Sequence, residues 1–214
     1  MIGVFAALIS AYSGTLASFL FREQTKYFSA LHINLIKNLI ACFIFLPALF
    51  TIDIFTNYKE TIILLISGCI GISIGDTFYI NALKNIGTRK TLTIESLSPI
   101  LANILGSLLI HETIKPQGWI GTIIVTLSLI CISIERTDDS NYDTSIKVSR
   151  GFLYAIFSVI CTVFAAILSR LVLSNSDLNP LQSSELRLIG SLLVLMTFVR
   201  IDLKQIKDTV PKKK

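Results

Sequence analysis

The chain has few charged residues and none of the common motifs of soluble enzymes. Only 15% of its 214 residues are Asp, Glu, Lys or Arg, and the mean hydropathy is +0.71. A soluble domain usually carries about 25% charged residues, so this sequence has too few to cover a water-exposed surface. HExxH, GxSxG and P-loop motifs are absent from the sequence, as is a Cys/His couple. The sequence therefore favours a membrane protein that is not an enzyme and has no catalytic residues.

Cysteine and basic residues each lack the arrangement that would give them a binding role. The four cysteines are single residues in different apolar segments, at Cys42, Cys69, Cys131 and Cys161. Because the CxxC and Cys/His spacings are absent, we expect the four cysteines to be packing residues. We expect no disulfide, metal site or other cofactor. The net charge is +5, but the basic residues fall in loops and in the C-terminal tail without interleaved aromatic residues. A nucleic-acid partner is therefore not expected.

Long apolar runs dominate the sequence instead. Each has about the twenty residues that an α-helix needs to cross a bilayer, and lipid offers no other partner for the backbone groups. The first run lacks the basic segment of a signal peptide, so we expect it to be retained. We therefore predict an all-α integral membrane protein whose partner is the lipid bilayer. Its seven transmembrane helices are expected at residues 2–21, 31–50, 61–82, 92–110, 117–134, 151–173 and 181–199.

The basic residues also predict an orientation. Fourteen of the 19 Lys and Arg residues fall on one side of these spans, and positive loops usually lie in the cytoplasm. The bias places the N-terminus outside and the tail inside.

The first and sixth runs resemble each other. Residues 3–22 and 151–170 align with small residues on small residues, at a shift of 148 positions, and Gly14 falls on Thr162. The next spans align at a shift of 150, where Lys37 falls on Arg187. A face of small residues can simply pack two helices together. However, two copies separated by five spans have opposite orientations, which predicts the inverted repeat of secondary transporters.

Asp76 is the only charged residue between Glu60 and Lys84. A carboxylate at this depth is a functional candidate by default, and Tyr79, three residues later, shares its helical face. We expect both to line a pathway for substrate or protons, with Lys37 as a further candidate. The alternative is a structural pair between Asp76 and Lys37 or Asn81. Ser67, Gly71 and Gly75 precede Asp76 as a small-xxx-small series that predicts close helix packing.

The fourth run carries a second acid on a polar and small face. That face consists of Glu95, Ser98, Pro99, Ala102, Asn103 and Gly106. It predicts either the wall of a hydrated cavity or a seam of hydrogen bonds between helices. Pro99 removes a helical hydrogen bond and predicts a kink. Glu95 follows Lys90 closely enough that an interfacial position is an equal alternative. Glu112, Glu185 and Arg187 are expected at the membrane interface.

Two segments resemble the EamA-type domain of the drug/metabolite transporter superfamily. One is "LSPILANILGSLLIHETIKPQGWIGTIIVTLSLICI", which contains Pro99, Glu112, Gln117 and Gly121. The other is "GISIGDTFYINALKNIG", residues 71–87. Arg187 is similar to the family's arginine in the second helix of a repeat, whereas Lys37 departs from it. The resemblance implies the following organisation: a complete five-helix repeat at 1–135, a polar linker at 136–150, two helices of a second repeat at 151–200 and a basic tail at 201–214.

The family resemblance implies ten helices in two inverted repeats around a central cavity. It implies export or exchange of small metabolites, with proton coupling, in the plasma (inner) membrane of a prokaryotic cell. It also implies a cytoplasmic N-terminus, against the charge bias. Because the sequence has seven predicted spans and the family has ten, we expect a truncated transporter. We expect it to be inactive unless a partner, or a second copy in a homodimer, supplies three helices. A non-transporting membrane scaffold or subunit is the main alternative. A lipid-modifying enzyme is less favoured because no acid, base and nucleophile gather at one interface.

Overall fold

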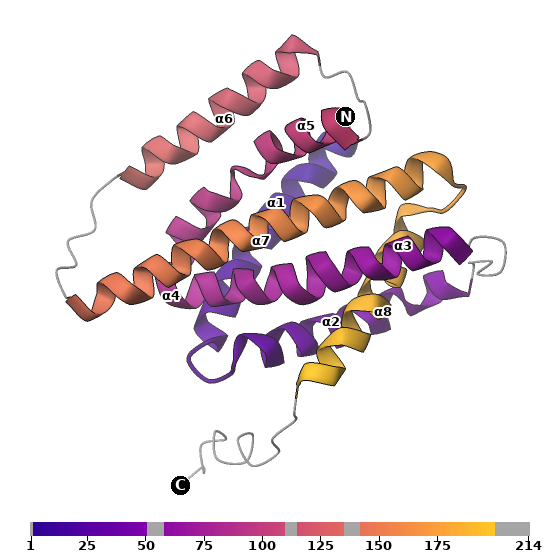
Figure 1. Ribbon diagram of the computed structural model, residues 1–214, viewed down its shortest axis with the longest axis horizontal. Coiled ribbons are helices and arrows are strands. Elements are labelled where there is room, and N and C mark those ends of the chain that lie inside the picture. The colour runs from indigo at the N-terminus through magenta and orange to yellow at the C-terminus, as the bar shows by residue number, and fades with distance from the viewer. Residues whose placement is uncertain (1, 51–57, 110–114, 135–141, 200–214) are drawn as a thin grey trace, which may run out of the picture.

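The computed structural model describes residues 2–50, 58–109, 115–134 and 142–199, and regular structure in these ranges is helical throughout (Figure 1). The elements follow the predicted apolar runs except at the boundary between the third and fourth, and the long apolar helices confirm a helical membrane protein. They are α1 (Ile2–Gln24), α2 (Ala30–Leu49), α3 (Tyr58–Gly68), the π-helical segment η1 (Cys69–Gly75), α4 (Asp76–Glu95), α5 (Ser98–Leu109), α6 (Pro116–Ile134), α7 (Tyr142–Asn175) and α8 (Pro180–Phe198).

Most of the helices run along the long axis of the molecule, whereas α1 and α8 cross it steeply (Figure 1). The turn between α1 and α2 lies at the lower left in that view, and the turn between α7 and α8 lies toward the right-hand end. Four helical stretches within the described ranges are long and apolar enough to cross a bilayer, and α5 is a shorter apolar helix. The four are Phe5–Gln24, Ala30–Ala48, Tyr58–Glu95 and Val148–Asn175.

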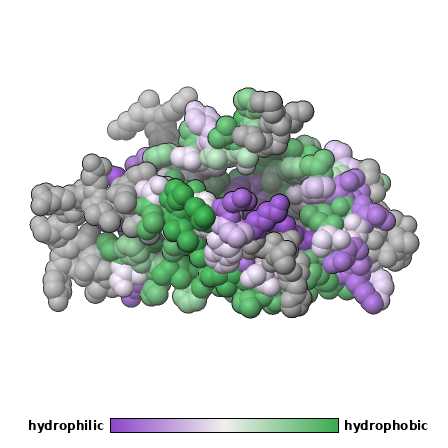
Figure 2. Space-filling view, turned by 90° about the horizontal axis from the view of Figure 1, so that it is seen from above, coloured by the Kyte–Doolittle hydropathy of each residue, from purple (hydrophilic) through white to green (hydrophobic). Residues whose placement is uncertain are grey.

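Large hydrophobic side chains cover the long sides of the molecule. Phe43 is 78% exposed and Ile9 66% exposed. The surface turned toward the viewer in Figure 2 is mainly hydrophobic between the two ends of the molecule, with a hydrophilic patch near its middle. Exposed apolar side chains on this scale are expected where lipid replaces water as the solvent.

α7 forms the centre of the bundle and packs along α4, η1, α3 and α5. The predicted small series makes several close contacts with α7. Ser67 donates a hydrogen bond to the Ala165 carbonyl at 2.7 Å. A Cβ atom at Gly71 would stand only 2.6 Å from the Ala165 Cβ, and one at Gly75 would stand 3.0 Å from the Thr162 Cγ2. The series therefore brings the backbones of η1 and α7 together.

The third span is longer than predicted. α3, η1 and α4 follow one another without a loop, and α4 is interrupted only at Gly87, where φ is +80°. This conformation is open to glycine at little cost and strains other residues. The Arg22 side chain at the end of α1 lies against Gly87. The turn between the third and fourth spans is thus reduced to a single glycine.

The fourth span is two helical pieces rather than one helix. Its first piece is the end of α4, and Ser96 and Leu97 form a turn before α5 begins at Ser98. Pro99 falls in the first turn of α5, where a missing N–H costs no helical hydrogen bond. The predicted interruption is present, but it lies before Pro99 rather than at it. The Ser96 hydroxyl donates to the Thr93 carbonyl and the Ser98 hydroxyl to the Glu95 carbonyl, which satisfies acceptors at the break.

Candidate functional site

A cavity of about 360 Å³ lies between α1, α4 and α7 near the break in the fourth span. Small and hydroxyl-bearing side chains form most of its wall, and two carboxyls and one amine lie among them. The lining residues are Ala11, Gly14, Thr15, Ala17, Ser18, Phe21, Lys37, Asp76, Tyr79, Leu92, Glu95, Ser158 and Thr162. Lys37, Asp76, Tyr79 and Glu95 were all candidates from the sequence. The fold brings these four together.

Asp76 forms an ion pair with Lys37, whose ammonium group reaches it from α2. Both side chains are only about a quarter exposed, at 27% and 26%. The structural pair that the sequence left open is therefore present, and it lies in the cavity wall. A pair in this setting compensates two charges that would each cost several kcal/mol if buried alone. The pair also leaves both groups accessible from the cavity.

Tyr79 connects α1 to the acids of α4. Its hydroxyl lies 2.6 Å from the Ser18 hydroxyl and also interacts with the Glu95 carboxyl. Glu95 ends α4 at the break, interacts electrostatically with Asp76 and lines the cavity. Its side chain therefore faces the inside of the bundle. Two carboxyls, a phenol and a serine hydroxyl form a connected polar group in this wall.

Arg187 and Glu185 face the inside of the bundle, and their expected position at the membrane interface stays a prediction. Arg187 is partly buried, extends toward Gly71 and interacts electrostatically with Asp76. Glu185 is fully buried, and its Oε1 accepts a hydrogen bond from the Cys42 thiol at 3.2 Å. The physical reason is that α8 packs between α2 and α3, so this face of α8 turns away from lipid. Hydropathy alone contains no information on that packing.

A buried polar network that the sequence reasoning missed supports η1 just before Asp76. The Asn34 amide donates to the carbonyls of Ile72 at 2.8 Å and Ser73 at 3.1 Å. Asn38 donates to the Asn34 side-chain oxygen and to the Ser191 hydroxyl, each at 3.1 Å. A π-helix interrupts the regular ladder of backbone hydrogen bonds; the Asn34 amide binds its carbonyls, and the Asn38 amide binds the Asn34 side chain. The spacing of Asn34 and Asn38, four residues apart in an apolar run, was the available signal.

The predicted polar face of the fourth span divides between two environments. Ser98, Pro99, Ala102 and Gly106 line a second cavity of about 370 Å³ against α7, and this cavity meets the first at Thr162. Asn103 instead donates a hydrogen bond to the Thr122 hydroxyl of α6 at 2.9 Å. The face therefore includes both a cavity wall and a hydrogen-bonded seam, which were the two alternatives.

The remaining candidates have less distinct environments. Gly14 lines the first cavity, and a Cβ atom there would meet nothing within 4 Å. A Cβ atom at Gly121 in α6 would likewise meet nothing within 4 Å. Glu112 and His111 lie outside the described residues. Within the described ranges, no three His, Cys, Asp or Glu residues gather in a way that could hold a metal ion.

Comparison with known proteins supplies a family. No curated protein and no solved structure matches the chain. The sequence model of the EamA-like transporter family matches residues 1–134, which is more than half of the chain. That stretch contains α1 to α6, with Lys37, Asp76, Tyr79 and Glu95. The chain therefore belongs to the EamA-like transporter family, a family of membrane transporters of small molecules.

Proposed function

We propose that this protein is a proton-coupled secondary transporter that exports or exchanges a small metabolite across the plasma membrane of a prokaryotic cell. The observation that carries the proposal is the Lys37–Asp76 pair in the wall of a cavity inside a membrane-spanning bundle. A structural pair needs no cavity beside it. Ionisable residues that face a cavity at membrane depth mark substrate and ion pathways.

The chemistry of the cavity suits an exchange of charges. Lys37 and Arg187 carry two positive charges near Asp76 and Glu95, so the group is neutral when both acids are ionised. A charged solute that pairs with one of these side chains takes the place of that side chain's partner. The displaced partner is then left without a counter-ion. An unpaired charge in this setting is costly, so protonation or deprotonation follows. Solute binding is thereby linked to proton movement.

The broken fourth span supports the same proposal. Glu95 is the last residue of α4, at the point where the helix is interrupted between the two cavities. Interrupted helices near the bilayer midplane form the substrate and ion sites of many secondary transporters. Thr162 of α7 lines both cavities opposite this break. A path from one cavity to the other passes this threonine.

The contact between α2 and α8 supports the inverted repeat. At the shift of 150, Cys42 corresponds to Leu192 and Leu35 to Glu185. Cys42 contacts Glu185, and Leu35 packs with Leu192 in one core cluster. Each contact is the counterpart of the other under an exchange of α2 and α8. We infer that these helices are related by a twofold axis in the membrane plane, as inverted repeats require.

The test is solute flux in proteoliposomes. Purified protein is reconstituted, and flux of a panel of metabolites is measured with and without an imposed pH gradient. We expect at least one solute to move faster than in empty liposomes, through a bundle that a second copy of the chain completes, and to respond to the gradient. Asp76→Asn keeps the size of the side chain but removes its charge, so it should reach normal membrane levels and lose most of the flux.

Asp177→Asn is the matched control, because Asp177 is an exposed acid in the turn between α7 and α8. It should transport as the wild type does. Flux that is equal in the Asp76→Asn and wild-type proteins would remove the ion pair from the mechanism. Flux that is indifferent to the pH gradient would refute proton coupling while leaving transport intact.

A further inference from the structure

An apolar groove opens between α1 and α2. The two helices are joined by the short turn at residues 25–29 and diverge from it (Figure 1). Near the turn, Phe21 still packs on Ala30 and Ile33. The groove includes this contact and has a volume of about 410 Å³, and Leu20, Ile36 and Ile40 form the part of its wall farther along α1 and α2. These three side chains are 59%, 49% and 58% exposed, so the groove is open to the surrounding lipid.

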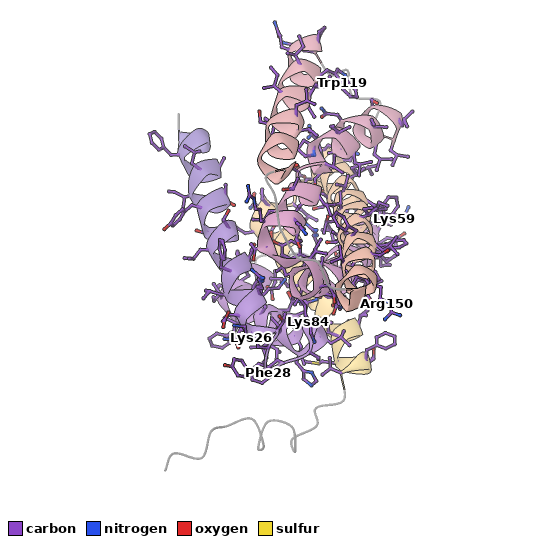
Figure 3. All side chains as sticks on the ribbon, turned by 90° about the vertical axis from the view of Figure 1, so that its left-hand side faces the viewer. Lys26, Phe28, Lys59, Lys84, Trp119 and Arg150 are labelled. Carbon is purple, nitrogen blue, oxygen red and sulfur yellow. The ribbon has the colours of Figure 1, made fainter. Side chains whose placement is uncertain are left out.

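The groove meets the charged cavity at Lys37 and Phe21, which line both. Lys37 is the one charged residue among the described residues of the groove wall, and its partner Asp76 lines only the cavity. The view of the left-hand end shows α1 standing apart from the rest of the bundle, with Lys26 and Phe28 near the turn (Figure 3). The groove therefore connects the bilayer to the ammonium group of the ion pair.

We propose that the groove binds a single-chain carboxylic acid dissolved in the bilayer, with its apolar chain between α1 and α2 and its carboxylate on Lys37 in place of Asp76. The inference rests on the proposed function, because it takes the charged cavity as the transport site. It adds the class of the substrate and the direction from which the substrate arrives.

The size of the groove favours one chain. A methylene group occupies about as much volume as a water molecule in the liquid, roughly 30 Å³, so 410 Å³ accommodates on the order of a dozen such groups. That is one chain of medium length and not the two chains of a phospholipid. A single ammonium group likewise matches a single negative charge.

Charge balance decides how the acid binds. The facing groups are Lys37 of α2, Asp76, Tyr79 and Glu95 of α4, and Arg187 of α8, with the Ser18 hydroxyl of α1. When both acids are ionised this group is neutral, so an extra anion would leave it with an uncompensated charge, which is costly in a low dielectric. The ligand therefore arrives as the neutral acid.

One proton transfer then completes the exchange. The O–H bond of the ligand breaks, an O–H bond forms on the Asp76 carboxylate, and the ligand carboxylate takes over the Lys37 ammonium. The total charge of the group is unchanged. Asp76 thus acts as an internal competitor for Lys37 and as the acceptor of the ligand's proton.

The test is binding to the full chain in nanodiscs of phosphatidylcholine. The probes are dansyl-undecanoate and its methyl ester, which has the same chain without the acid, and empty nanodiscs provide the background. A charge-assisted hydrogen bond contributes about 1.5–3 kcal/mol, so the Asp76→Asn variant, which lacks the competitor, should bind the carboxylate at least about tenfold more tightly than the ester. The wild type should show a smaller preference for the carboxylate, because the ligand must displace Asp76 from Lys37. Equal affinities for the two probes would overturn the proposal.

Two variants change the affinities in opposite directions. Lys37→Gln should abolish the preference for the carboxylate and retain binding of the ester, which shows that the groove is intact. Asp76→Asn should tighten carboxylate binding, because the competitor for Lys37 is gone. Lys26→Gln is the control, since Lys26 pairs with Glu23 at the exposed end of α1. A preference that survives Lys37→Gln, or carboxylate binding that weakens in Asp76→Asn, would contradict the proposal.

The groove itself is tested by filling it. Ile36→Trp should weaken binding of both probes, whereas Leu39→Trp, on an exposed part of α2 outside the groove, should not. Normal binding in Ile36→Trp would place the probe elsewhere. Displacement of the probe by added phosphatidylglycerol would identify a phospholipid as the occupant instead. Since binding requires no flux, a failure of the groove leaves transport standing, and a failure of transport leaves the groove standing.

Discussion

Asp76 and Lys37 lie where an unpaired charge would be costly, and each is compensated by the other. The pair is part of a wider polar group, because Asp76 also interacts with Glu95 and Arg187. Removing one partner of such a pair usually costs more than the pair contributes, since the other charge is left uncompensated. Single substitutions in this group should therefore affect function through the partner that remains.

Tyr79 provides the first prediction at this scale. Tyr79→Phe removes the hydroxyl that contacts Ser18 and Glu95 and leaves the ring in place. We expect a loss of about 0.5–1.5 kcal/mol in the free energy of unfolding, measured by titration with SDS in mixed micelles, together with reduced solute flux. Tyr154→Phe is the control, because the Tyr154 ring stacks on Phe78 at 5.8 Å and keeps that contact. Equal effects of the two substitutions would show that the Tyr79 hydroxyl has no special role.

At the scale of elements, η1 depends on side chains from another helix. Asn34 binds the carbonyls of Ile72 and Ser73, and its substitution by alanine leaves both without that donor. We expect Asn34→Ala to lower the free energy of unfolding by about 1–3 kcal/mol in the same titration. Asn175→Ala removes an exposed amide whose hydrogen bonds go to Leu171 and Ser174 of its own helix, so it should change the free energy of unfolding little. If both substitutions are silent, η1 is stable without the amide of α2.

The contact between η1 and α7 should tolerate no added side chain. A Cβ atom at Gly71 would stand 2.6 Å from the Ala165 Cβ, so Gly71→Val forces the two helices apart. Overpacking of this kind typically costs about 1–3 kcal/mol, which a lower thermal transition in detergent would show. Gly14→Val meets nothing within 4 Å and should leave the transition unchanged. An unchanged transition in Gly71→Val would mean that the helices separate without cost.

The polar face of α5 provides a prediction about water access. In a background without native cysteine, Ala102→Cys in the second cavity should react with a membrane-impermeant thiol reagent. Leu105→Cys should react far more slowly, because Leu105 packs against the apolar cluster of α7 that contains Val159, Val163 and Ile167. Equal labelling of the two positions would contradict a hydrated cavity at Ala102.

Part of the fold and of the candidate site could be predicted from the sequence. Hydropathy located the spans, and the isolated charge of Asp76 marked a site because a lone acid in an apolar run is visible without a structure. The burial of Glu185 and the Ser18–Tyr79 contact could not be predicted, because both depend on which helices become neighbours. The π-helical form of η1 also has no pattern of its own; it follows from Gly71, Gly75 and the amide of Asn34 acting together.

At the scale of the whole molecule, the family match and the packing describe a helical bundle with a charged cavity between α1, α4 and α7. The matched residues 1–134 contain Lys37, Asp76, Tyr79 and Glu95, and α7 completes the wall through Ser158 and Thr162. α1 contributes small residues to this wall on one face and exposes large apolar residues on the other. The central claim is that water reaches the charged cavity from outside the bilayer.

Labelling on α1 tests that claim most directly, because neighbouring positions there face the cavity and the lipid. In the cysteine-free background, Ala17→Cys places a thiol in the cavity wall, and Phe19→Cys places one on the exposed apolar face, where Phe19 is 56% exposed. The account predicts that a membrane-impermeant thiol reagent modifies the Ala17→Cys protein in intact membranes and spares the Phe19→Cys protein. Protection of the Ala17→Cys protein, or equal modification of both, would contradict a water-filled cavity around Asp76.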